Sequence, residues 1–407
     1  MKIRKTKGQK NVVREQKRGF RTIEINEDVE EQILAYRKNN LKLFVRTILI
    51  IVLVILTVKI VFALRSYDSY EVTNSIERNS SKAAQYEVFQ EYLLEYSNDG
   101  ISCMMGNQEI VWNQSFEMVS PKIVTCGDYV AVYDASGTQI FIMTQKGVEK
   151  NIETTSPIQT LCVAEQGTIA VLMKENNVSQ VKLFDKKGKE LANGKFYGDK
   201  GSFPIDIALS YDGTKLAVDM VDVSAGKVNT TISFYNFGSV GQGEIDNNVG
   251  AYTFEGVLVP EIDYVSSSRM IGLGTGSVLV FDGAQKPELT REIIIEQEVL
   301  SCFHNEKYVG IIYDNVDDEE LWHIKVMDFR GNTVMENDTS VAFDKVEFLS
   351  NNEVCVMNPT ECQLFTTHSI KKFSYSFDKE LYKVLAGDTE QNYTFIFKDT
   401  IEEVKLK

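Results

Sequence analysis

The stretch YVAVYDASGTQIFIM, residues 129–143, decides the fold class of this chain. Two runs rich in valine, isoleucine, tyrosine and phenylalanine, residues 129–134 and 139–143, flank a connection that contains Gly137. Runs of this length and composition are typical of β-strands, and a glycine between them supplies the positive φ of a tight turn. The stretch therefore predicts two antiparallel strands joined by a hairpin.

The same pattern returns along the chain, at residues 168–188 and again at 308–331. In each copy a strand run ends in aspartate, and a glycine follows within three residues. Equivalent points lie about 40 residues apart where no insertion intervenes, which leaves room for about four strands in each unit. Four-stranded units at this period are the signature of a β-propeller. Helical periodicity is nearly absent from residues 85–407, so this region is predicted to be all-β.

Six complete units and two partial ones can be placed along this region. The complete units are expected to begin near Pro121, Pro157, Pro204, Val259, Val299 and Phe343. Partial units remain at residues 92–116 and 381–406, and residues 238–250 are predicted to form an inserted loop. A propeller hides its edge strands by closing on itself, so the two partial units are expected to share or abut a blade. Seven or eight four-stranded blades result, and eight are favoured.

Charge is distributed unevenly along the 407 residues, whose formal net charge is -15. Residues 1–46 carry 13 lysines and arginines against six acidic residues, which leaves 30 basic and 52 acidic residues for the rest. The two parts are therefore expected to face different environments. The composition, 43% apolar and 25% charged with six cysteines, is globular and excludes a disordered chain, a polytopic transporter and a disulfide-built scaffold.

Between the two parts lies LFVRTILIIVLVILTVKIVFAL, residues 43–64, with an uncharged run at 47–58. As a helix, this segment would span roughly 33 Å, enough for a hydrocarbon core of about 30 Å. Arg46 and Lys59 lie near its ends, where long side chains can reach the headgroups. One transmembrane helix is predicted, with its basic flank in the cytoplasm. A cleaved signal peptide is the alternative, because residues 61–63 offer small positions for a peptidase, but the long leader favours an uncleaved signal anchor.

These observations divide the chain into four parts. Residues 1–42 are predicted to be a basic cytoplasmic tail with a short helix at 27–39, followed by the transmembrane helix at 43–64. Residues 65–84, polar and rich in serine and asparagine, are predicted to be a stalk or linker, and 85–407 to be an extracytoplasmic propeller. The basic tail suits contact with anionic lipid, whereas nucleic acid is disfavoured as a partner because no aromatic interleaving accompanies the charge.

Two short motifs resemble those of known propellers. SYDGTKLA, residues 210–217, resembles the S-P-D-G-x-x-L-A strand-turn-strand of YVTN- and TolB-type propellers, with Tyr211 where proline is usual. GISCMMGNQEIVW, residues 100–112, resembles the repeat of quinoprotein-dehydrogenase-like propellers, which ends in G-x-x-x-W. Both motifs agree with the predicted fold.

Across nearly the whole chain, the order of segments resembles the bacterial family of domain of unknown function 5711. After the basic tail and the single span, the segments are VWNQSFEM (111–118), CGDYVAV (126–132), SFYNFGSVGQ (233–242), HNEKYVG (304–310) and a C-terminal IEEVKLK (401–407). The resemblance implies a membrane-anchored propeller of the kind found in Gram-positive anaerobes. Members have no assigned activity, so the resemblance implies no catalytic, cofactor-binding or metal-ligating residue.

Residue patterns that would indicate an enzyme or a metal centre are mostly missing from the sequence. No G-x-S-x-G or C-x-x-C occurs, and the three histidines, His304, His323 and His368, are not at metal-ligand spacing. Cys302 and His304 share a strand face and are the one candidate pair of thiolate and base, although a small buried thiol beside a loop histidine is favoured. No catalytic residue, metal or cofactor is predicted.

Three further motifs are expected to be structural. Residues 272–277, GLGTGS, are predicted to form a β-turn and not a phosphate loop, because strands flank them on both sides. The acidic residues 314–320 are predicted to form a solvated turn and not a calcium loop. Cys355 and Cys362 flank a hairpin and are expected to be a reduced buried pair, with a disulfide across the hairpin as the alternative.

Three function classes stay open. The first hypothesis is a non-enzymatic binding module in the cell envelope, with a protein or glycan partner and signalling to the cytoplasmic tail. The alternative is a scaffold for envelope assembly or division. The third class, an enzyme that uses the central channel, has the least support from the residues.

Overall fold

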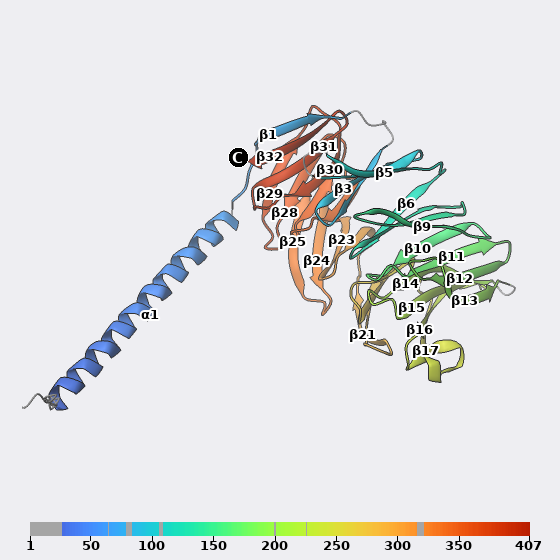
Figure 1. Ribbon diagram of the computed structural model, residues 1–407, viewed down its shortest axis with the longest axis horizontal. Coiled ribbons are helices and arrows are strands. Elements are labelled where there is room, and N and C mark those ends of the chain that lie inside the picture. Colours follow the sequence, from blue (N-terminus) through green and yellow to red (C-terminus); the bar gives the residue numbers. More distant parts are fainter. Residues whose placement is uncertain are drawn as a thin grey trace, which may run out of the picture. The chain divides into compact units, whose positions relative to one another are not determined.

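The computed structural model divides into two units, Met1–Ala63 and Leu64–Lys407 (Figure 1). The structure describes residues 27–63, 65–78, 84–105, 109–198, 201–224, 226–315 and 321–407. The side chains of residues 27–35, 39, 56 and 58–63 lie outside this description, as does the whole of the predicted basic tail before residue 27.

The described residues of the first unit form one continuous helix, α1 (Glu27–Ala63). It includes the short helix predicted at residues 27–39 and all of the predicted span except Leu64, which lies outside the described residues. Its apolar side chains between Leu41 and Ile55 are exposed. In the described part of the chain, no helix has both the length and the mean hydropathy needed to cross a bilayer.

The second unit is a β-propeller of eight four-stranded antiparallel sheets. Blades 1 to 4 comprise β2 (Gln85–Phe89), β3 (Tyr92–Ser97), β4 (Gly100–Met104) and β5 (Ile110–Ser115); β6 (Pro121–Cys126), β7 (Tyr129–Asp134), β8 (Gln139–Thr144) and β9 (Gly147–Glu153); β10 (Ile158–Val163), β11 (Ile169–Glu175), β12 (Val178–Phe184) and β13 (Glu190–Tyr197); and β14 (Ser202–Leu209), β15 (Lys215–Asp222), β16 (Asn229–Asn236) and β17 (Asn248–Glu255). Blades 5 to 7 comprise β18 (Glu261–Tyr264), β19 (Arg269–Gly274), β20 (Ser277–Asp282) and β21 (Glu288–Ile294); β22 (Val299–His304), β23 (Tyr308–Asp314), β24 (Trp322–Asp328) and β25 (Thr333–Thr339); and β26 (Lys345–Phe348), β27 (Val354–Met357), β28 (Glu361–Phe365) and β29 (Lys371–Ser376). Blade 8 comprises β30 (Leu381–Ala386), β31 (Asn392–Phe397), β32 (Thr400–Leu406) and β1 (Tyr70–Glu77).

The predicted β-propeller is confirmed, and the number of blades is eight. The six units predicted to be complete begin within two residues of the expected positions, at β6, β10, β14, β18, β22 and β26. The unit predicted as partial at residues 92–116 is complete, because β2 precedes it and pairs with β3. The insertion predicted at residues 238–250 contains two short 3-10 helices, η1 (Gly241–Gly243) and η2 (Ile245–Asn247), but it ends at residue 247, because β17 begins at Asn248.

Blade 8 is completed by a strand from the other end of the propeller. β1 pairs antiparallel with β32, from Tyr70 opposite Leu406 to Glu77 opposite Thr400 (Figure 1). The prediction of a linker at residues 65–84 is therefore wrong for residues 70–77, which form β1. The side chains of β1 are all exposed or half-buried, so the strand has no buried apolar face that a sequence pattern could reveal. It is held by backbone hydrogen bonds to β32 and by the ring of Tyr70, its first residue, which packs against aromatic side chains of blades 7 and 8.

Tyr67, which precedes β1, and Tyr70, the first residue of β1, make further contacts with the propeller. Tyr67 is buried, and its N–H donates a hydrogen bond of 2.7 Å to the carbonyl of Lys372. Tyr70 packs edge to face against Phe395, with ring centroids 5.3 Å apart. A chain that begins at Arg65 therefore contains every strand and both of these tyrosine contacts.

The hydrophobic core is divided, in the described residues, into eight clusters that each join two consecutive blades. Blades 2 and 3 meet through side chains such as Ile140 and Val171, and blades 8 and 1 meet through Ile396 and Tyr86. Successive residues of a strand point to opposite faces, so each sheet can pack against both of its neighbours. This closes the ring, and it explains how so many residues fold around a repeated core.

The β7–β8 hairpin differs in one detail from the prediction. Ser136 takes the positive φ, 69°, whereas Gly137 is required for space, because a Cβ there would lie 2.3 Å from Oδ2 of Asp134. At the same spacing from an aspartate, Gly188 and Gly331 take φ values of 80° and 85°, as predicted, but they lie one hairpin later in their blades, between β12 and β13 and between β24 and β25. The same aspartate-to-glycine spacing is thus used for two different steric reasons.

Candidate functional site

Cys302 and His304, the candidate pair from the sequence, lie in surroundings that disfavour a reactive thiolate. Nε2 of His304 is 3.4 Å from Oε1 of Glu261 and 3.8 Å from Oδ2 of Asp263, both on β18 of the neighbouring blade. Burial opposes protonation of the ring, but the hydrogen bond to Glu261 and the nearby carboxylate charges raise the pKa of His304 overall. Burial raises the pKa of the Cys302 thiol to about 12, so the thiol stays protonated.

The other sequence motifs have mostly structural roles. Gly274 pairs with Ser277 across the β19–β20 hairpin, which confirms a β-turn. Cys355 and Cys362 are buried and free, with sulfur atoms 3.8 Å apart, which confirms a reduced pair. Of the acidic segment at 314–320, residues 316–320 lie outside the described residues. In the part of the chain that the structure describes, no group of three or more histidine, cysteine and acidic residues is placed to hold a metal ion.

The SYDGTKLA motif forms the strand-turn-strand that it was expected to form, between β14 and β15. Oδ1 of Asp212 accepts hydrogen bonds from the Ser210 hydroxyl at 2.6 Å and from the Thr214 N–H at 3.1 Å. Nζ of Lys215, a residue that is 1% exposed, lies 3.0 Å from Oδ2 of the same aspartate. The motif therefore stabilises a turn.

Three carboxyl groups near the contact of blades 4 and 5 hold their protons to unusually high pH. Asp206 on β14 lies opposite Asp219 on β15, and Oδ2 of Asp206 accepts the Ile262 N–H at 2.9 Å. Asp219 is fully buried, and neither of its carboxyl oxygens has a hydrogen-bond partner among the described residues. Burial raises the pKa of Asp263 to about 6, that of Asp206 to about 7 and that of Asp219 to about 8, where the charge of Asp206 adds to the shift. Asp219 is therefore mostly neutral at pH 7.

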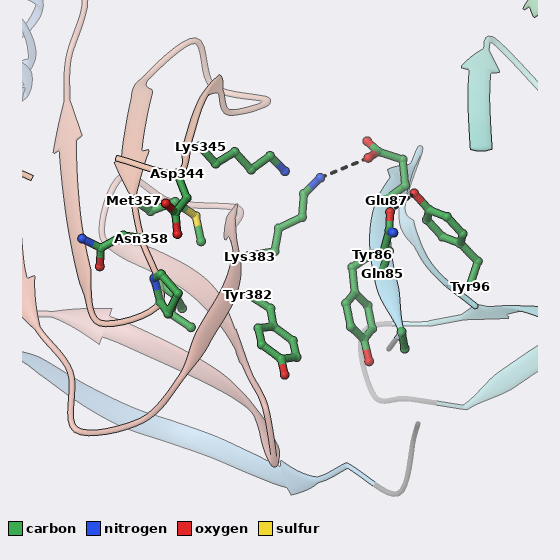
Figure 2. A pocket seen from close by; sticks show the side chains of 13 residues that line it. Gln85, Tyr86, Glu87, Tyr96, Asp344, Lys345, Met357, Asn358, Tyr382 and Lys383 are labelled. Atoms are coloured by element: carbon green, nitrogen blue, oxygen red, sulfur yellow. Dashed lines mark hydrogen bonds and ion pairs between the residues drawn. The ribbon is translucent and has the colours of Figure 1, made fainter. Parts of the chain in front are cut away.

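Four charged side chains meet where the inner strands of blades 7, 8 and 1 come together. Nζ of Lys383 on β30 lies 3.2 Å from Oε2 of Glu87 on β2 and 3.7 Å from Oε2 of Glu347 on β26. Nζ of Lys345 is 3.0 Å from the same oxygen of Glu347. We name these four residues the seam cluster, and Figure 2 shows Lys383 reaching across to Glu87. The cluster ties three blades together through their inner strands.

Lys383 remains charged although its side chain is only 6% exposed. Burial by itself would lower the pKa of the Lys383 ammonium, but the carboxylates of Glu347 and Glu87 together raise it. A buried ammonium needs such partners, because an unpaired charge is strongly disfavoured in a protein interior. The seam cluster is therefore a fixed, paired arrangement of charges.

A cavity of about 450 Å³ opens on one side of the seam cluster, at the first residues of β2, β26 and β30. Its lining contains three tyrosines, Tyr86, Tyr96 and Tyr382, and we name it the tyrosine cavity (Figure 2). Asp344 and Asn358 line the side that blade 7 contributes. The cavity thus combines aromatic rings with hydrogen-bonding groups from three blades.

The aromatic rings of the tyrosine cavity are held in place by polar neighbours. Cζ of Arg78, which follows β1, lies 4.8 Å from the ring centroid of Tyr86 and 5.3 Å from that of Tyr382. A guanidinium over an aromatic face is an attractive contact. The Tyr96 hydroxyl donates a hydrogen bond of 2.7 Å to Oε1 of Gln85. These contacts fix the positions of the three rings.

None of these lining residues was predicted from the sequence as a site. A signal is nevertheless present, because β2 contains Tyr86-Glu-Val88 and β30 contains Tyr382-Lys-Val384. Ionisable residues also occur within the inner strands β14, β18 and β26, but here the two charges are opposite and occupy adjacent blades. The two tripeptides become neighbours only because the last blade packs against the first.

Comparison with solved structures gives many similar folds at low identity. BamB from Moraxella catarrhalis is similar with a TM-score of 0.48 and 12% identity, over 83% of this chain and 100% of that chain. The WD40 domain of Pan2 from Neurospora crassa is similar with a TM-score of 0.46 and 8% identity, over 84% of this chain and 97% of that chain. Likeness at this level says nothing about a ligand or an activity. No curated protein matches the sequence.

The family comparison is more specific. The profile described as "Family of unknown function (DUF5711)" matches residues 63–406, which include all eight blades. The expected resemblance is thereby confirmed over the entire propeller. The chain belongs to this family of unknown function, DUF5711.

Proposed function

We propose that this protein is a membrane-anchored, extracytoplasmic β-propeller that acts as a non-enzymatic binding module, and that a protein or glycan of the cell envelope occupies its tyrosine cavity. The cavity itself carries the proposal. Its volume of about 450 Å³ lies in the range of sites that hold small ligands or the side chains of a partner. Tyrosine offers a broad apolar ring and a hydroxyl, a combination that suits both peptides and sugars.

The chemistry of the seam cluster favours binding over catalysis. Lys383 and Glu87 neutralise each other at 3.2 Å, and Lys383 is also within 3.7 Å of Glu347. A general acid or base has to exchange a proton with a substrate near neutral pH, whereas a lysine whose pKa is raised by two carboxylates holds its proton. The cluster therefore supports a fixed electrostatic surface at the base of the cavity.

Membrane anchoring is proposed from the sequence. Residues 43–64 contain the uncharged run at 47–58 and follow a strongly basic segment. The exposed side chains of α1 between Leu41 and Ile55 include apolar residues on every side of the helix, a pattern typical of a helix surrounded by lipid. With the basic flank in the cytoplasm, the propeller would lie on the outer side, and a partner bound there would be linked through α1 to the tail.

A photo-crosslinking side chain at Asp344, an exposed residue on the rim of the tyrosine cavity, is expected to capture the partner in intact cells. Adding Tyr382→Ala to the same chain should reduce the yield at least about threefold, because it removes one of the three rings. The measurement is the mass of the crosslinked product, which distinguishes a protein from a glycan.

The control for this experiment places the same crosslinker at Tyr197, which is 65% exposed on β13 and does not line the cavity. Equal products from both positions would contradict a specific site. The absence of any product at Asp344, in a protein whose unfolding midpoint is unchanged, would overturn the proposal for this cavity.

The full chain is expected to sediment with membranes and to resist extraction by alkaline carbonate, because its anchor would be embedded in hydrocarbon. A chain that begins at Arg65 should stay in the supernatant. External protease added to cells without their wall should digest the propeller of the full chain. Extraction of the full chain by carbonate, or complete protection of the propeller from protease, would contradict the proposed anchoring and orientation.

A further inference from the structure

A second cavity lies on the other side of the seam cluster. Its volume is about 570 Å³, and it is lined by the last residues of β2, β26 and β30 and by the residues that follow these strands. Glu87 and Lys383 line both cavities, so the seam cluster separates the two. The tyrosine cavity uses the beginnings of the same three strands, and the two cavities therefore open toward opposite ends of them.

The charge of the second cavity is strongly one-sided. Four acidic residues line it, Glu87, Glu91, Glu347 and Asp388, against one basic residue, Lys383. We name it the acidic cavity. Lys383 is already engaged by Glu87 and Glu347, whereas the exposed Glu91 and Asp388 form no ion pair with any basic side chain in the described residues. The lining can therefore accept further positive charge but offers no free cation to an anion.

A buried carboxylate oxygen of Glu347 lacks a hydrogen-bond donor. Oε1 of Glu347 is buried and has no hydrogen-bond partner in the described part of the chain, although Oε2 of the same carboxylate contacts Lys345 and Lys383. A buried carboxylate oxygen without a donor is disfavoured by the full desolvation of that atom. Glu347 lines the acidic cavity, and a cation bound there would be attracted to its carboxylate charge without contacting this buried oxygen.

Apolar side chains complete the lining of the acidic cavity. Tyr92, Leu93 and Met105 contribute from blade 1, and Phe348 and Leu385 contribute from blades 7 and 8. The side chain of Met105 is 43% exposed and so is accessible from the cavity. Methionine and aromatic side chains adapt to varied apolar ligands. The lining thus offers an apolar surface beside four carboxylates.

We propose that the acidic cavity binds a segment of a partner protein in which a lysine or arginine lies next to a large apolar side chain. The cationic group is held by the carboxylates of Glu91, Asp388 and Glu347, and the apolar side chain packs against Phe348 and Met105. Charge complementarity fixes the sign of the ligand, and the apolar lining excludes a purely polar cation. This site uses different residues from the rim of the tyrosine cavity and does not depend on its occupation.

The test uses the full chain in zwitterionic nanodiscs and a dye-labelled peptide, acetyl-Lys-Leu-Phe-Lys-amide, with binding followed by fluorescence anisotropy. The double variant Glu91→Gln, Asp388→Asn is expected to weaken binding at least about fivefold, since two carboxylates at an exposed rim are neutralised. Binding should also weaken when NaCl is raised from about 50 to about 300 mM. Peptides with glutamate in place of lysine, or serine in place of leucine and phenylalanine, should bind at least about tenfold more weakly.

The matched control is Glu149→Gln, Glu153→Gln, which removes the same charge from exposed positions on β9 in blade 2. It is expected to leave the affinity within about twofold of the parent, because these exposed residues do not line the cavity. Equal weakening by both double variants would show attraction to the overall negative charge only and would overturn the proposal. Unchanged binding by Glu91→Gln, Asp388→Asn, or equal binding of the glutamate peptide, would overturn it as well.

This outcome is independent of the crosslinking at Asp344. Loss of the Asp344 product with retained peptide binding would reject the tyrosine cavity and leave the acidic cavity standing. A retained Asp344 product together with peptide binding that the double variant leaves unchanged would reject the acidic cavity alone.

Discussion

A chain that begins at Ala84, and therefore lacks β1, is expected to lose at least about 5 kcal/mol of its free energy of unfolding, or to fail to fold. The deletion removes the whole antiparallel ladder with β32, the buried Tyr67 and the packing of Tyr70 against Phe395. It also exposes an unpaired strand edge in blade 8, which invites association between chains. Urea unfolding and size-exclusion chromatography measure both effects.

The control for the deletion is the chain that begins at Arg65. It lacks the helix but keeps β1, so its propeller should unfold in one cooperative transition and elute as a discrete species. A peptide of residues 65–78 added to the shorter chain should restore part of the lost stability by pairing with β32. Equal midpoints for the two chains would show that β1 is dispensable for closure.

The propeller is expected to be more stable at pH 5 than at pH 8.5. Asp263, Asp206 and Asp219 have pKa values of about 6, 7 and 8, above those of an unfolded chain, so the folded state holds protons that unfolding releases. The free energy of unfolding therefore falls as the pH rises from about 4 to about 8. The raised pKa of His304 acts in the same direction, because its contribution is present below pH 6.5 and is lost as the pH rises through its folded value.

Asp219→Asn is the variant that isolates this effect. An amide cannot ionise, so the variant should be more stable than the parent by on the order of 3 kcal/mol at pH 8.5 and nearly equal to it at pH 5. Calorimetric unfolding of the chain from Arg65 at several pH values measures the difference. Glu255→Gln, at an exposed position on β17 of the same blade, is the control and should leave the slope unchanged. An unfolding midpoint of the parent that rises with pH would contradict this prediction. An unfolding midpoint of Asp219→Asn below that of the parent at pH 8.5 would also contradict it.

Prediction of the fold succeeded where the signal is local. The starts of six blades were located within two residues, because alternation of apolar residues and turn glycines is set by neighbours in sequence. It failed at β1, whose side chains are exposed or half-buried and whose partner, β32, lies at the far end of the chain. It also misassigned the role of Gly137, since the clash with Asp134 that excludes a side chain there is visible only in the folded hairpin.

The residues of the candidate site could not be predicted from the sequence for a related reason. In the sequence, Glu87 and Lys383 are ordinary charged residues. Ring closure brings β2 beside β30, and the two side chains then form an ion pair that keeps the Lys383 ammonium charged. Asp219 likewise gives no sign in the sequence that both of its carboxyl oxygens lack partners. Long-range pairing and desolvation create these properties, and neither produces a periodic pattern in the amino-acid sequence.

The sequence by itself determined that this is an all-β propeller with units of about 40 residues, because strand periodicity and turn chemistry are properties of consecutive residues. Only the tertiary structure decided that eight blades close through β1, that four charges form the seam cluster, and that a cavity lies on each side of it. The physical reason is that closure joins residues some 300 positions apart, and burial then sets their charge, their partners and the space between them.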